Sequence, residues 1–327
     1  MNFRAFRVTI APELVQSVES LDVSILPSHP VLIKVHYSSL NYKDALSASG
    51  NKGVTKNYPH TPGIDAAGVV VESQDPRWRT GDRVLITGFD LGMNTFGGFS
   101  EYIRVPSEWI VKCPEALDLR EAMCFGTAGF TAALSVAKII ENVPIEAGEI
   151  LVTGATGGVG SVAIAILSKL GYSVVGASGK PETEWFIKSI GAKRMVLRSE
   201  VDDLSGKPLL KPLWAGVIDT VGGNLLATAI KSTQYGGHVT TCGNVSGHEF
   251  TTSVYPFILN GITLHGIDSV KCDLSKREKI WQLIATEWKI KGFPEAVLEI
   301  GLDGIKEQLD LMLAGKHLGR TIVNPSK

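Results

Sequence analysis

The sequence predicts an α/β protein with a doubly wound, parallel six-stranded sheet and a second, mostly β domain. Three observations lead to this prediction. Short alternating apolar runs broken by Gly, Pro, Asn and Asp extend to about residue 120, apolar strands alternating with helical segments follow, and a glycine-rich turn joins a strand to a helix within residues 149–171. Alternating strands and helices are typical of parallel sheets with helical crossovers. A chain of 327 residues is also longer than one typical domain.

The first part of the chain is expected to form short strands with one buried face, because its apolar residues alternate with a period of two. These runs begin at Phe3, Val31, Ala66 and Asp82. Near the end of the chain, after an amphipathic helix from Arg277, the run TIV is too short to stand alone, so we expect it to return to this domain as an added strand. The mostly β domain is therefore predicted to comprise residues 1–122 and 271–327.

The parallel-sheet domain is predicted to comprise residues 123–270. A helix from Leu119 is expected to run to Cys124 and to continue beyond the GTAGF motif that follows it. Six strands are expected at residues 150–153, 173–177, 194–197, 217–220, 238–242 and 263–267, with helices between them that include segments starting at Glu184, Leu225 and Tyr255. Six strands with helical crossovers make a doubly wound sheet of the Rossmann type.

The strand, turn and helix of residues 149–171 carry the spacing Ala155-x-Gly157-x-x-Gly160. This is the dinucleotide-binding fingerprint with its first glycine replaced by alanine, and the turn still lets backbone N–H groups approach a pyrophosphate. The N-terminus of the helix adds the positive end of its dipole. Because the strand and the helix that the motif requires flank it, we predict a bound dinucleotide rather than an ordinary glycine turn.

The end of the next strand indicates which dinucleotide is bound. An acidic residue about 20 positions after the glycines would mark NAD, because it binds the ribose hydroxyls. This chain has Ser178, Gly179 and Lys180 there, and no carboxylate before Glu182. A hydroxyl, a backbone N–H and an ammonium suit a 2′-phosphate, so NADPH is predicted in preference to NADH. The alternative is that Lys180 is a solvated surface lysine.

Composition and charge exclude several other classes of protein. The net charge is −1 without a basic run, so neither nucleic acid nor an anionic membrane surface is an expected partner. The N-terminus lacks an apolar signal core, and no segment is expected to reach membrane-spanning length, so the protein is expected in the cytoplasm. The cysteines are far apart and are expected to be buried thiols. They are Cys113, Cys124, Cys242 and Cys272.

The order of the predicted domains resembles the medium-chain dehydrogenase/reductase superfamily, in which a GroES-like domain precedes the Rossmann domain. Zinc-dependent members carry a cysteine ligand three residues before an aspartate and a histidine in a Pro-Gly-His-Glu run. Here the matching residues are Asn41, three before Asp44, and Ile64 in the run PGID. Zinc prefers thiolate, imidazole and carboxylate ligands. The chain therefore resembles the zinc-free, quinone-oxidoreductase-like branch, and no metal is expected.

Several motifs resemble more narrowly the acrylyl-CoA reductase family, over nearly the whole chain. They are SSLNYKDAL from Ser38, PGIDAAG from Pro62, GTAGFTA from Gly126, TGATGGVGS from Thr153, ASGK from Ala177, WAGVIDTVGG from Trp214 and PFILNGITLHGIDSV from Pro256. The resemblance implies NADPH-dependent reduction of the C2–C3 double bond of acrylyl-CoA to propanoyl-CoA.

The same resemblance implies which residues contact the cofactor. They are Tyr42, the phosphate-loop residues Thr156, Gly157, Gly158, Val159 and Gly160, then Ser178, Gly179, Lys180, Arg198, Asn244, Ile258 and Ser269. The family usually has arginine where this chain has Lys180, which keeps the charge but loses the planar fork. Asn244 occupies a variable position, so we expect a backbone contact there.

Reduction of an enoyl thioester requires an oxyanion donor and a proton source, because negative charge develops on the thioester oxygen as hydride reaches the β-carbon. Asn41, Tyr42 and Lys43 are the nearby donors, all on the loop that would have held zinc. Asn41 and Tyr42 are the predicted catalytic residues. Tyr42 either donates the proton or only packs against the cofactor, and solvent is a further proton source. Asp44 and Asp65 are interpreted as structural.

Two other functions remain open at this level. A zinc-independent NADPH quinone or enone oxidoreductase needs the same hydride geometry, and a non-catalytic NADPH-binding sensor can share the fold. Lys52 and Lys56 are weak candidates for the phosphates of CoA. A homodimer is expected from the resemblance, through the edge strand at residues 263–267. The histidines, including His36, His60, His238 and His265, are interpreted as structural rather than catalytic.

Overall fold

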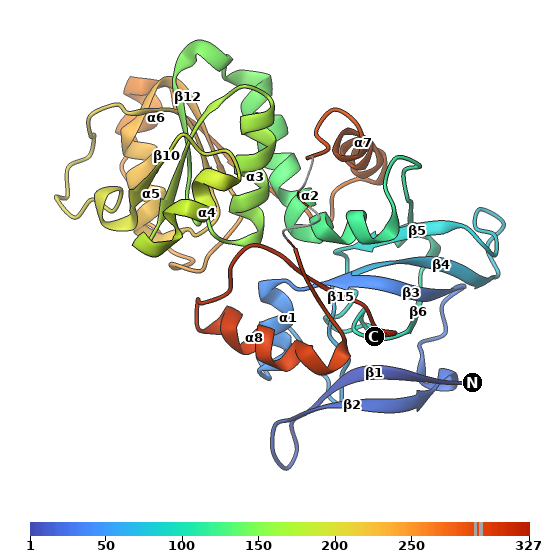
Figure 1. Ribbon diagram of the computed structural model, residues 1–327. Coiled ribbons are helices and arrows are strands. Elements are labelled where there is room, and N and C mark those ends of the chain that lie inside the picture. The colour runs from blue at the N-terminus through green and yellow to red at the C-terminus, as the bar shows by residue number, and fades with distance from the viewer. Residues whose placement is uncertain (291–292, 294–296) are drawn as a thin grey trace. The chain divides into compact units, whose positions relative to one another are not determined.

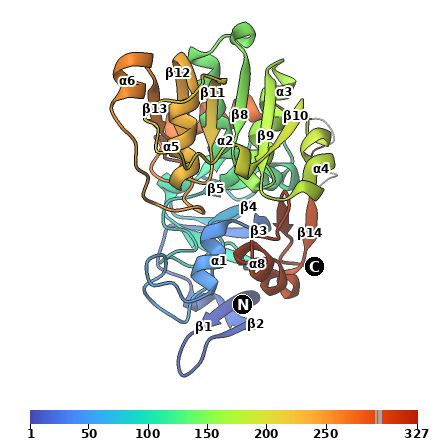
Figure 2. The same cartoon turned by 90° about the vertical axis from the view of Figure 1, so that its left-hand side faces the viewer.

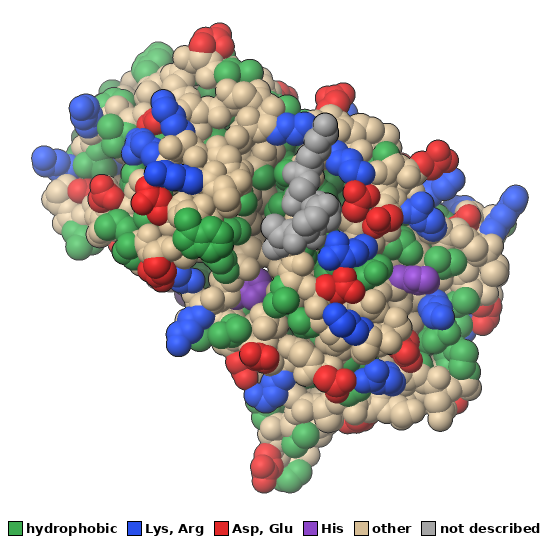
Figure 3. All heavy atoms as spheres, in the orientation of Figure 1, with side chains coloured by type: hydrophobic (Ala, Val, Ile, Leu, Met, Phe, Trp, Pro, Cys, Tyr) green, Lys and Arg blue, Asp and Glu red, His purple; other side chains and the backbone are tan. Residues whose placement is uncertain are grey.

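The computed structural model describes residues 1–290, 293 and 297–327, which form two compact units (Figure 1). Unit 1 contains residues 1–127, 270–287 and the described part of 291–327. Unit 2 contains residues 128–269 and 288–290. On the face drawn in Figure 3, basic and acidic side chains are interspersed, in keeping with the net charge of −1.

Unit 2 is built on a six-stranded sheet in the order β10-β9-β8-β11-β12-β13, and every pair is parallel (Figure 2). The strands are β8 (Glu149–Val152), β9 (Ser173–Ser178), β10 (Arg194–Leu197), β11 (Trp214–Asp219), β12 (Thr233–Thr241) and β13 (Thr263–Gly266). All six predicted strands are confirmed. The strand order reverses beside β8, and ligands of such sheets bind outside the carboxyl ends of the strands at that point.

The helices of unit 2 also fall where the sequence predicts them. They are α3 (Gly158–Lys169), α4 (Glu184–Ser189), α5 (Gly223–Ser232) and α6 (Tyr255–Asn260). Between sheet and helix, the apolar runs of the strands bury residues such as Leu151, Val175 and Val217 against Leu226 and Ile230 of α5. Strands buried on both faces carry continuous apolar runs, and the alternation of these runs with helical segments is what predicted a parallel sheet.

Unit 1 contains a seven-stranded sheet in the order β14-β15-β3-β4-β5-β7, with β6 paired to β3, and a two-stranded hairpin of β1 and β2. The strands are β1 (Asn2–Thr9), β2 (Val15–Asp22), β3 (Val31–Ser39), β4 (Asp65–Ser73), β5 (Arg83–Thr87), β6 (Tyr102–Val105), β7 (Val111–Lys112), β14 (Leu298–Ile300) and β15 (Thr321–Val323). The four predicted N-terminal strands are confirmed. The C-terminal run also returns as expected, since β15 pairs antiparallel with β3.

Of three helices in unit 1, two differ from the prediction and one confirms it. They are α1 (Tyr42–Ala48), α7 (Leu274–Ala285) and α8 (Ile305–Leu313). The prediction that Tyr42 and Lys43 lie on a loop was wrong, because Asp44 accepts the backbone N–H of Asn41 at 2.8 Å and so caps a short helix. The helix predicted from Arg277 is confirmed as α7, and α8 was not predicted.

Helix α2 (Leu119–Asn142) has a break at Gly126, whose φ of 53° and ψ of −155° are not helical. The expectation that no segment approaches membrane-spanning length was wrong for this helix, which has 24 residues and is apolar enough by composition. However, 78% of its 18-residue apolar window is buried within the protein, as in the core helix of a globular fold.

Candidate active site and cofactor site

The phosphate loop of unit 2 leaves β8 in a tight turn held by backbone hydrogen bonds. Gly154 has φ of 60°, which glycine adopts without strain. The N–H of Gly157 donates to the carbonyl of Gly154 at 2.9 Å, and the N–H of Ala155 donates to Ala177 of β9 at 3.2 Å. A Cβ on Gly160 would collide with the carbonyl oxygen of Gly154. The third glycine of the motif is therefore required by this turn.

The N-terminus of α3 is left open by this loop. Its N-cap is Gly157, which has no side chain to cap the helix. Within the described part of the chain, the N–H groups of Gly158, Val159 and Gly160 have no hydrogen-bond acceptor. Such N–H groups, together with the helix dipole, bind anions. The loop thus fits a pyrophosphate, with Thr156 half-buried at its tip.

The carboxyl end of β9 brings together the residues predicted for the adenosine end of the cofactor. The guanidinium of Arg198 packs against Gly179 so closely that a Cβ there would lie 3.3 Å from its Cζ. Arg198 is exposed and follows β10, the neighbour of β9. Lys180 is half-buried beside Gly179. Two cations therefore flank one short turn, an arrangement that favours a phosphate group.

The hydroxyl of Ser178 serves the turn itself. It accepts the N–H of Lys180 at 3.1 Å and lies 3.1 Å from the hydroxyl of Thr183. Because Thr183 donates its own hydrogen to the carbonyl of Lys180 at 2.7 Å, Ser178 must be the donor of the pair. Ser178 is buried, so it shapes the turn that presents Lys180.

The remaining predicted cofactor residues lie at other places on unit 2. Asn244 follows β12 and packs against the turn after β11, where a Cβ on Gly222 would lie 3.3 Å from its Cα. Ile258 lies on α6 with 68% of its surface exposed. Ser269 is half-buried at the end of the long segment of unit 2. Asn244 is thus adjacent to the carboxyl end of the sheet.

In unit 1, Asn41 is buried at the start of α1 and is held by Asp65. Its side-chain nitrogen donates to Asp65 Oδ2 at 2.8 Å and to the carbonyl of Ser39 at 3.2 Å. Both neighbours are acceptors, which determines the orientation of the amide. Both amide hydrogens of Asn41 are therefore used in hydrogen bonds within the protein, and its amide oxygen is the atom that can accept a hydrogen bond from a ligand. This arrangement does not supply the oxyanion donor that the sequence suggested.

Asp65, which begins β4, is the centre of this network and is fully buried. Besides Asn41, its carboxylate accepts the Ser39 hydroxyl at 2.6 Å, the Thr127 N–H at 2.8 Å and the Thr127 hydroxyl at 2.5 Å. A Cβ on Gly126 would collide with Ser39, so the break in α2 passes directly over the network. The interpretation of Asp65 as an acceptor agrees with these contacts.

Asp44 and Arg320 complete the buried cluster. Asp44 accepts the N–H groups of Gly63 and Ile64 at 3.1 and 2.9 Å. Burial and the Asp65 charge raise the pKa of Asp44 to about 7, although the hydrogen bonds from these N–H groups lower it. Arg320 donates to the carbonyls of Cys124 and Leu40 at 3.0 and 2.9 Å, and its Nη2 is buried without a hydrogen-bond partner.

Arg320 is therefore a buried cation beside two buried carboxylates. Its own pKa is lowered by burial and raised by Asp65. Arg320 was not predicted as a site residue, because it lies far from both aspartates along the chain. The sequence marks it only as an arginine that directly precedes the apolar TIV run.

The other predicted donors and histidines are placed as follows. Tyr42 and Lys43 are half-buried on the first turn of α1. His60 is buried and contacts the carbonyl of Gly92 at 2.9 Å through Nε2, which must therefore carry the hydrogen. His238 and His265 contact each other across β12 and β13 at 2.8 Å. These contacts give the three histidines structural roles.

Metal-binding chemistry is limited in the described residues. Among them, no group of three or more His, Cys, Asp or Glu side chains is arranged to hold a metal ion. Ile64 is buried and apolar. Burial raises the pKa of Cys124 to about 11 and that of Cys242 to about 12, so these thiols are protonated at neutral pH.

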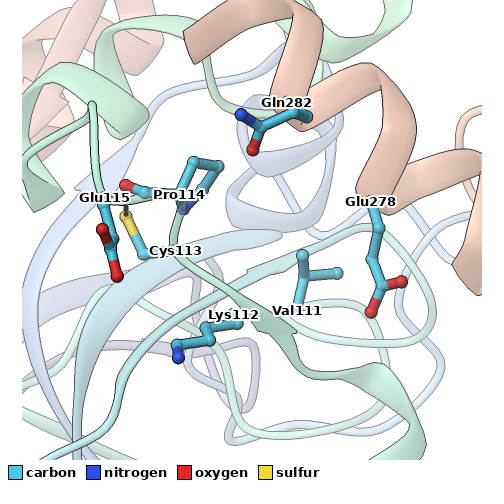
Figure 4. Close-up of a pocket in the computed structure, with 7 residues that line it drawn as sticks. All are labelled: Val111, Lys112, Cys113, Pro114, Glu115, Glu278 and Gln282. Carbon is cyan, nitrogen blue, oxygen red and sulfur yellow. Dashed lines mark hydrogen bonds between the residues drawn. The ribbon is translucent and has the colours of Figure 1, made fainter.

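A pocket of about 280 Å³ lies in unit 1 between β7 and α7 (Figure 4). It is lined by Val111, Lys112, Cys113, Pro114, Glu115, Glu278 and Gln282. None of these residues belongs to the network around Asp65 or was predicted as a site residue. Burial raises the pKa of Cys113, which makes its thiol unreactive.

Comparison with known proteins identifies both parts of the chain. The alcohol dehydrogenase GroES-like domain family matches residues 27–115, and the zinc-binding dehydrogenase family matches residues 158–286. The chain is 40% identical over 309 residues to the acrylyl-CoA reductase AcuI of Ruegeria pomeroyi, covering 94% of each chain.

Two solved structures have nearly the same fold. The yhdH oxidoreductase of Salmonella enterica in complex with NADP is 41% identical, with a TM-score of 0.95 over 98% of this chain and 99% of that one. The Bacillus subtilis protein yhfP with NAD bound is 42% identical, with a TM-score of 0.95 over 99% of each chain. The chain therefore belongs to the acrylyl-CoA reductase family, within the quinone-oxidoreductase-like oxidoreductases of the medium-chain dehydrogenase/reductase superfamily.

Proposed function

We propose that the protein reduces the 2,3 double bond of acrylyl-CoA to propanoyl-CoA with NADPH. The observation that carries the proposal is the similarity, over 94% of both chains, to a relative named acrylyl-CoA reductase. The open N-terminus of α3 and the cations Lys180 and Arg198 support the choice of cofactor, which a 41% identical structure also holds.

NADPH, when bound, supplies the hydride that reaches the β-carbon of the enoyl thioester. The N–H groups of Gly158, Val159 and Gly160 would hold its pyrophosphate, and Arg198 with Lys180 would hold its 2′-phosphate. Thr156, Gly157, Asn244, Ile258 and Ser269 remain proposed contacts of the same cofactor. Accordingly, residues 123–270 are proposed as the cofactor-binding domain, and residues 1–122 with 271–327 as the catalytic domain.

We propose Asn41 and Tyr42 as the catalytic residues. Asn41 offers its amide oxygen, because Asp65 and Ser39 engage its hydrogens. It would therefore orient a donor group of the substrate or cofactor rather than stabilise the oxyanion. Tyr42 remains the donor for the proton or the cofactor contact, since the phenol group can do either.

A quinone or enone oxidoreductase is the second candidate, because both substrates accept a hydride at an activated alkene carbon. A non-catalytic sensor is the third. We further propose that the protein is a homodimer in the cytoplasm. Among the described residues, the four cysteines form no disulfide bond, which is consistent with a reducing compartment.

The test is oxidation of NADPH and of NADH by purified, metal-analysed protein with acrylyl-CoA, crotonyl-CoA or a simple quinone. Fast turnover with NADPH and acrylyl-CoA is expected. Turnover with quinones alone would transfer the function to the second candidate. Binding of NADPH without turnover on any acceptor would favour the sensor, and NADH turnover equal to that with NADPH would reject the roles given to Lys180 and Arg198.

A further inference from the structure

The carboxyl edge of the sheet in unit 2 is tied together by one buried carboxylate. Asp219 is the last residue of β11 and is fully buried. It accepts the hydroxyls of Thr153 at 2.8 Å and Thr241 at 3.0 Å, and the backbone N–H groups of Gly222 at 3.0 Å and Val221 at 3.4 Å. Because β8 and β12 flank β11, a single side chain joins three adjacent strand ends.

The contact with Thr153 leads directly into the phosphate loop. Thr153 follows β8 and precedes Gly154, where the loop turns. Its hydroxyl hydrogen is given to Asp219, so its oxygen is free to accept the N–H of Thr220 at 3.0 Å. Thr220 in turn donates its hydroxyl to the carbonyl of Thr153 at 2.9 Å. Asp219 therefore orients the Thr153 hydroxyl so that its oxygen accepts from Thr220, at the point where the loop leaves the sheet.

The turn that follows is packed against this pair. A Cβ on Gly154 would collide with the hydroxyl oxygen of Thr220, so the loop and Thr220 are in close contact. Beyond Gly154, the bond from Gly157 to the Gly154 carbonyl starts the geometry that leaves the N–H groups of α3 open. A shift of Thr153 would thus move the N–H groups that face the pyrophosphate.

We propose that Asp219 is a positioning residue of the cofactor site, which acts through Thr153 and Thr220 to hold the phosphate loop in the conformation that binds a dinucleotide. The inference rests on the proposed function, because the ligand is the proposed cofactor. Charge alone would have the opposite effect, since an additional carboxylate near a phosphate site disfavours an anion. Loss of the Asp219 charge should therefore weaken NADPH binding if Asp219 positions the loop, and strengthen it if only its charge matters.

The experiment compares D219N, T153V and T241V by the dissociation constant for NADPH, measured by fluorescence titration, and by the Tm without cofactor. T241V is the matched control, because Thr241 gives Asp219 a similar hydroxyl bond but lies at the end of β12, away from the loop. We expect D219N and T153V to weaken NADPH binding about tenfold or more, and T241V less than about threefold, although each variant loses a buried hydrogen bond and some Tm.

Steady-state kinetics and the conservative variant T153S provide two further measurements that would not change if Asp219 had only a stabilising role. The KM for NADPH should rise with the dissociation constant while kcat at saturating NADPH stays within about threefold of the original value. T153S, which keeps the hydroxyl, should restore affinity relative to T153V.

Tighter NADPH binding by D219N would overturn the proposal in favour of a charge effect. If T153V and T241V lose NADPH affinity equally, in proportion to their loss of Tm, Asp219 only stabilises the fold. This comparison does not require D219N to fold. Absence of NADPH binding by the unmodified protein would instead overturn the proposed function itself.

Discussion

At the scale of single residues, the network around Asp65 shows how a predicted catalytic side chain is restricted by its neighbours. Four hydrogen-bond donors converge on this carboxylate, from Ser39, Asn41 and twice from Thr127. A carboxylate that receives four donors needs no further partner, and the donors lose their orientation without it. Asp65 therefore determines the orientation of the Asn41 side chain.

The first prediction concerns D65N. An amide at this position replaces one acceptor oxygen by a donor, so at least one of the buried donors loses its partner, which costs about 1–3 kcal/mol of unfolding free energy. Because Asn41 is released, we also expect kcat to fall by about tenfold or more. Chemical denaturation and steady-state kinetics measure the two effects.

The control for this prediction is S38A, since the Ser38 hydroxyl donates to the backbone carbonyl of the same Asp65 at 2.6 Å. It should lower stability by about 1 kcal/mol and leave kcat unchanged. A similar fall of kcat in both variants would show that the effect is one of stability and not of orientation.

The second prediction compares two glycines of the phosphate loop. G160A places a Cβ against the backbone carbonyl of Gly154, which cannot move without opening the turn, whereas in G157A the nearest atom is 3.3 Å away. We therefore expect G160A to weaken NADPH binding by about tenfold or more and G157A by much less. Fluorescence titration of both variants provides the test, and equal losses would contradict the geometry described.

At the scale of elements, the strands β12 and β13 are joined by a histidine pair. The rings of His238 and His265 are stacked at 5.1 Å with 13° between their planes. Burial lowers both pKa values below 6.5, and His265 lowers the pKa of His238 further. Lys138 has a smaller effect in the same direction and Glu141 an opposing one. Lys138 and Glu141 form an ion pair on α2 at 2.8 Å. The folded protein thus favours neutral rings.

The third prediction follows from this direction. The unfolded chain binds protons below pH 6.5 more readily than the folded pair, so the stability contributed by the neutral rings is present above pH 6.5 and is lost as the pH falls through the lower folded pKa values. We expect H265Q to reduce the loss of Tm between pH 7.5 and pH 5, measured by calorimetry at one fixed scan rate.

H248Q is the matched control, because His248 is exposed at 83% of its side chain. It should leave the slope of Tm against pH as in the unmodified protein. An unchanged slope in H265Q would show that the pair does not contribute to the acid response.

At the scale of the whole molecule, unit 1 is assembled from segments far apart in the chain. Arg320, just before β15, donates to carbonyls of Leu40 and Cys124 and lies beside Asp44 and Asp65. The C-terminal segment thereby supplies the buried cation of a cluster whose other members come from the first 127 residues. A cation removed from such a site leaves uncompensated buried carboxylates.

The fourth prediction is that R320M destabilises the protein by about 3–5 kcal/mol, because methionine keeps the approximate length of the side chain but removes the charge and both hydrogen bonds. R320K keeps the charge without the planar fork and should lose less. Guanidinium unfolding monitored by tryptophan fluorescence gives both values, and a loss below about 1 kcal/mol in R320M would contradict the role assigned to the buried cation.

The order of strands and helices in unit 2, the phosphate loop and the return of the TIV run were determined by the sequence alone, because periodicity, glycine spacing and flanking elements are local signals. The helix α1 was missed because its capping partner, Asp44, was read as part of a loop. Family membership followed from motifs spread over the chain and was confirmed by the matches described above.

Only the tertiary structure decided how the site residues are used. The engagement of Asn41 by Asp65 and the proximity of Arg320 to Asp44 and Asp65 each depend on contacts between distant segments. The donor role of Ser178 toward Thr183 depends on how the turn between them folds. The spacing of residues along the chain predicts which face of an element is buried. It does not predict which buried acceptor a donor meets, because that is set by the packing of the folded chain.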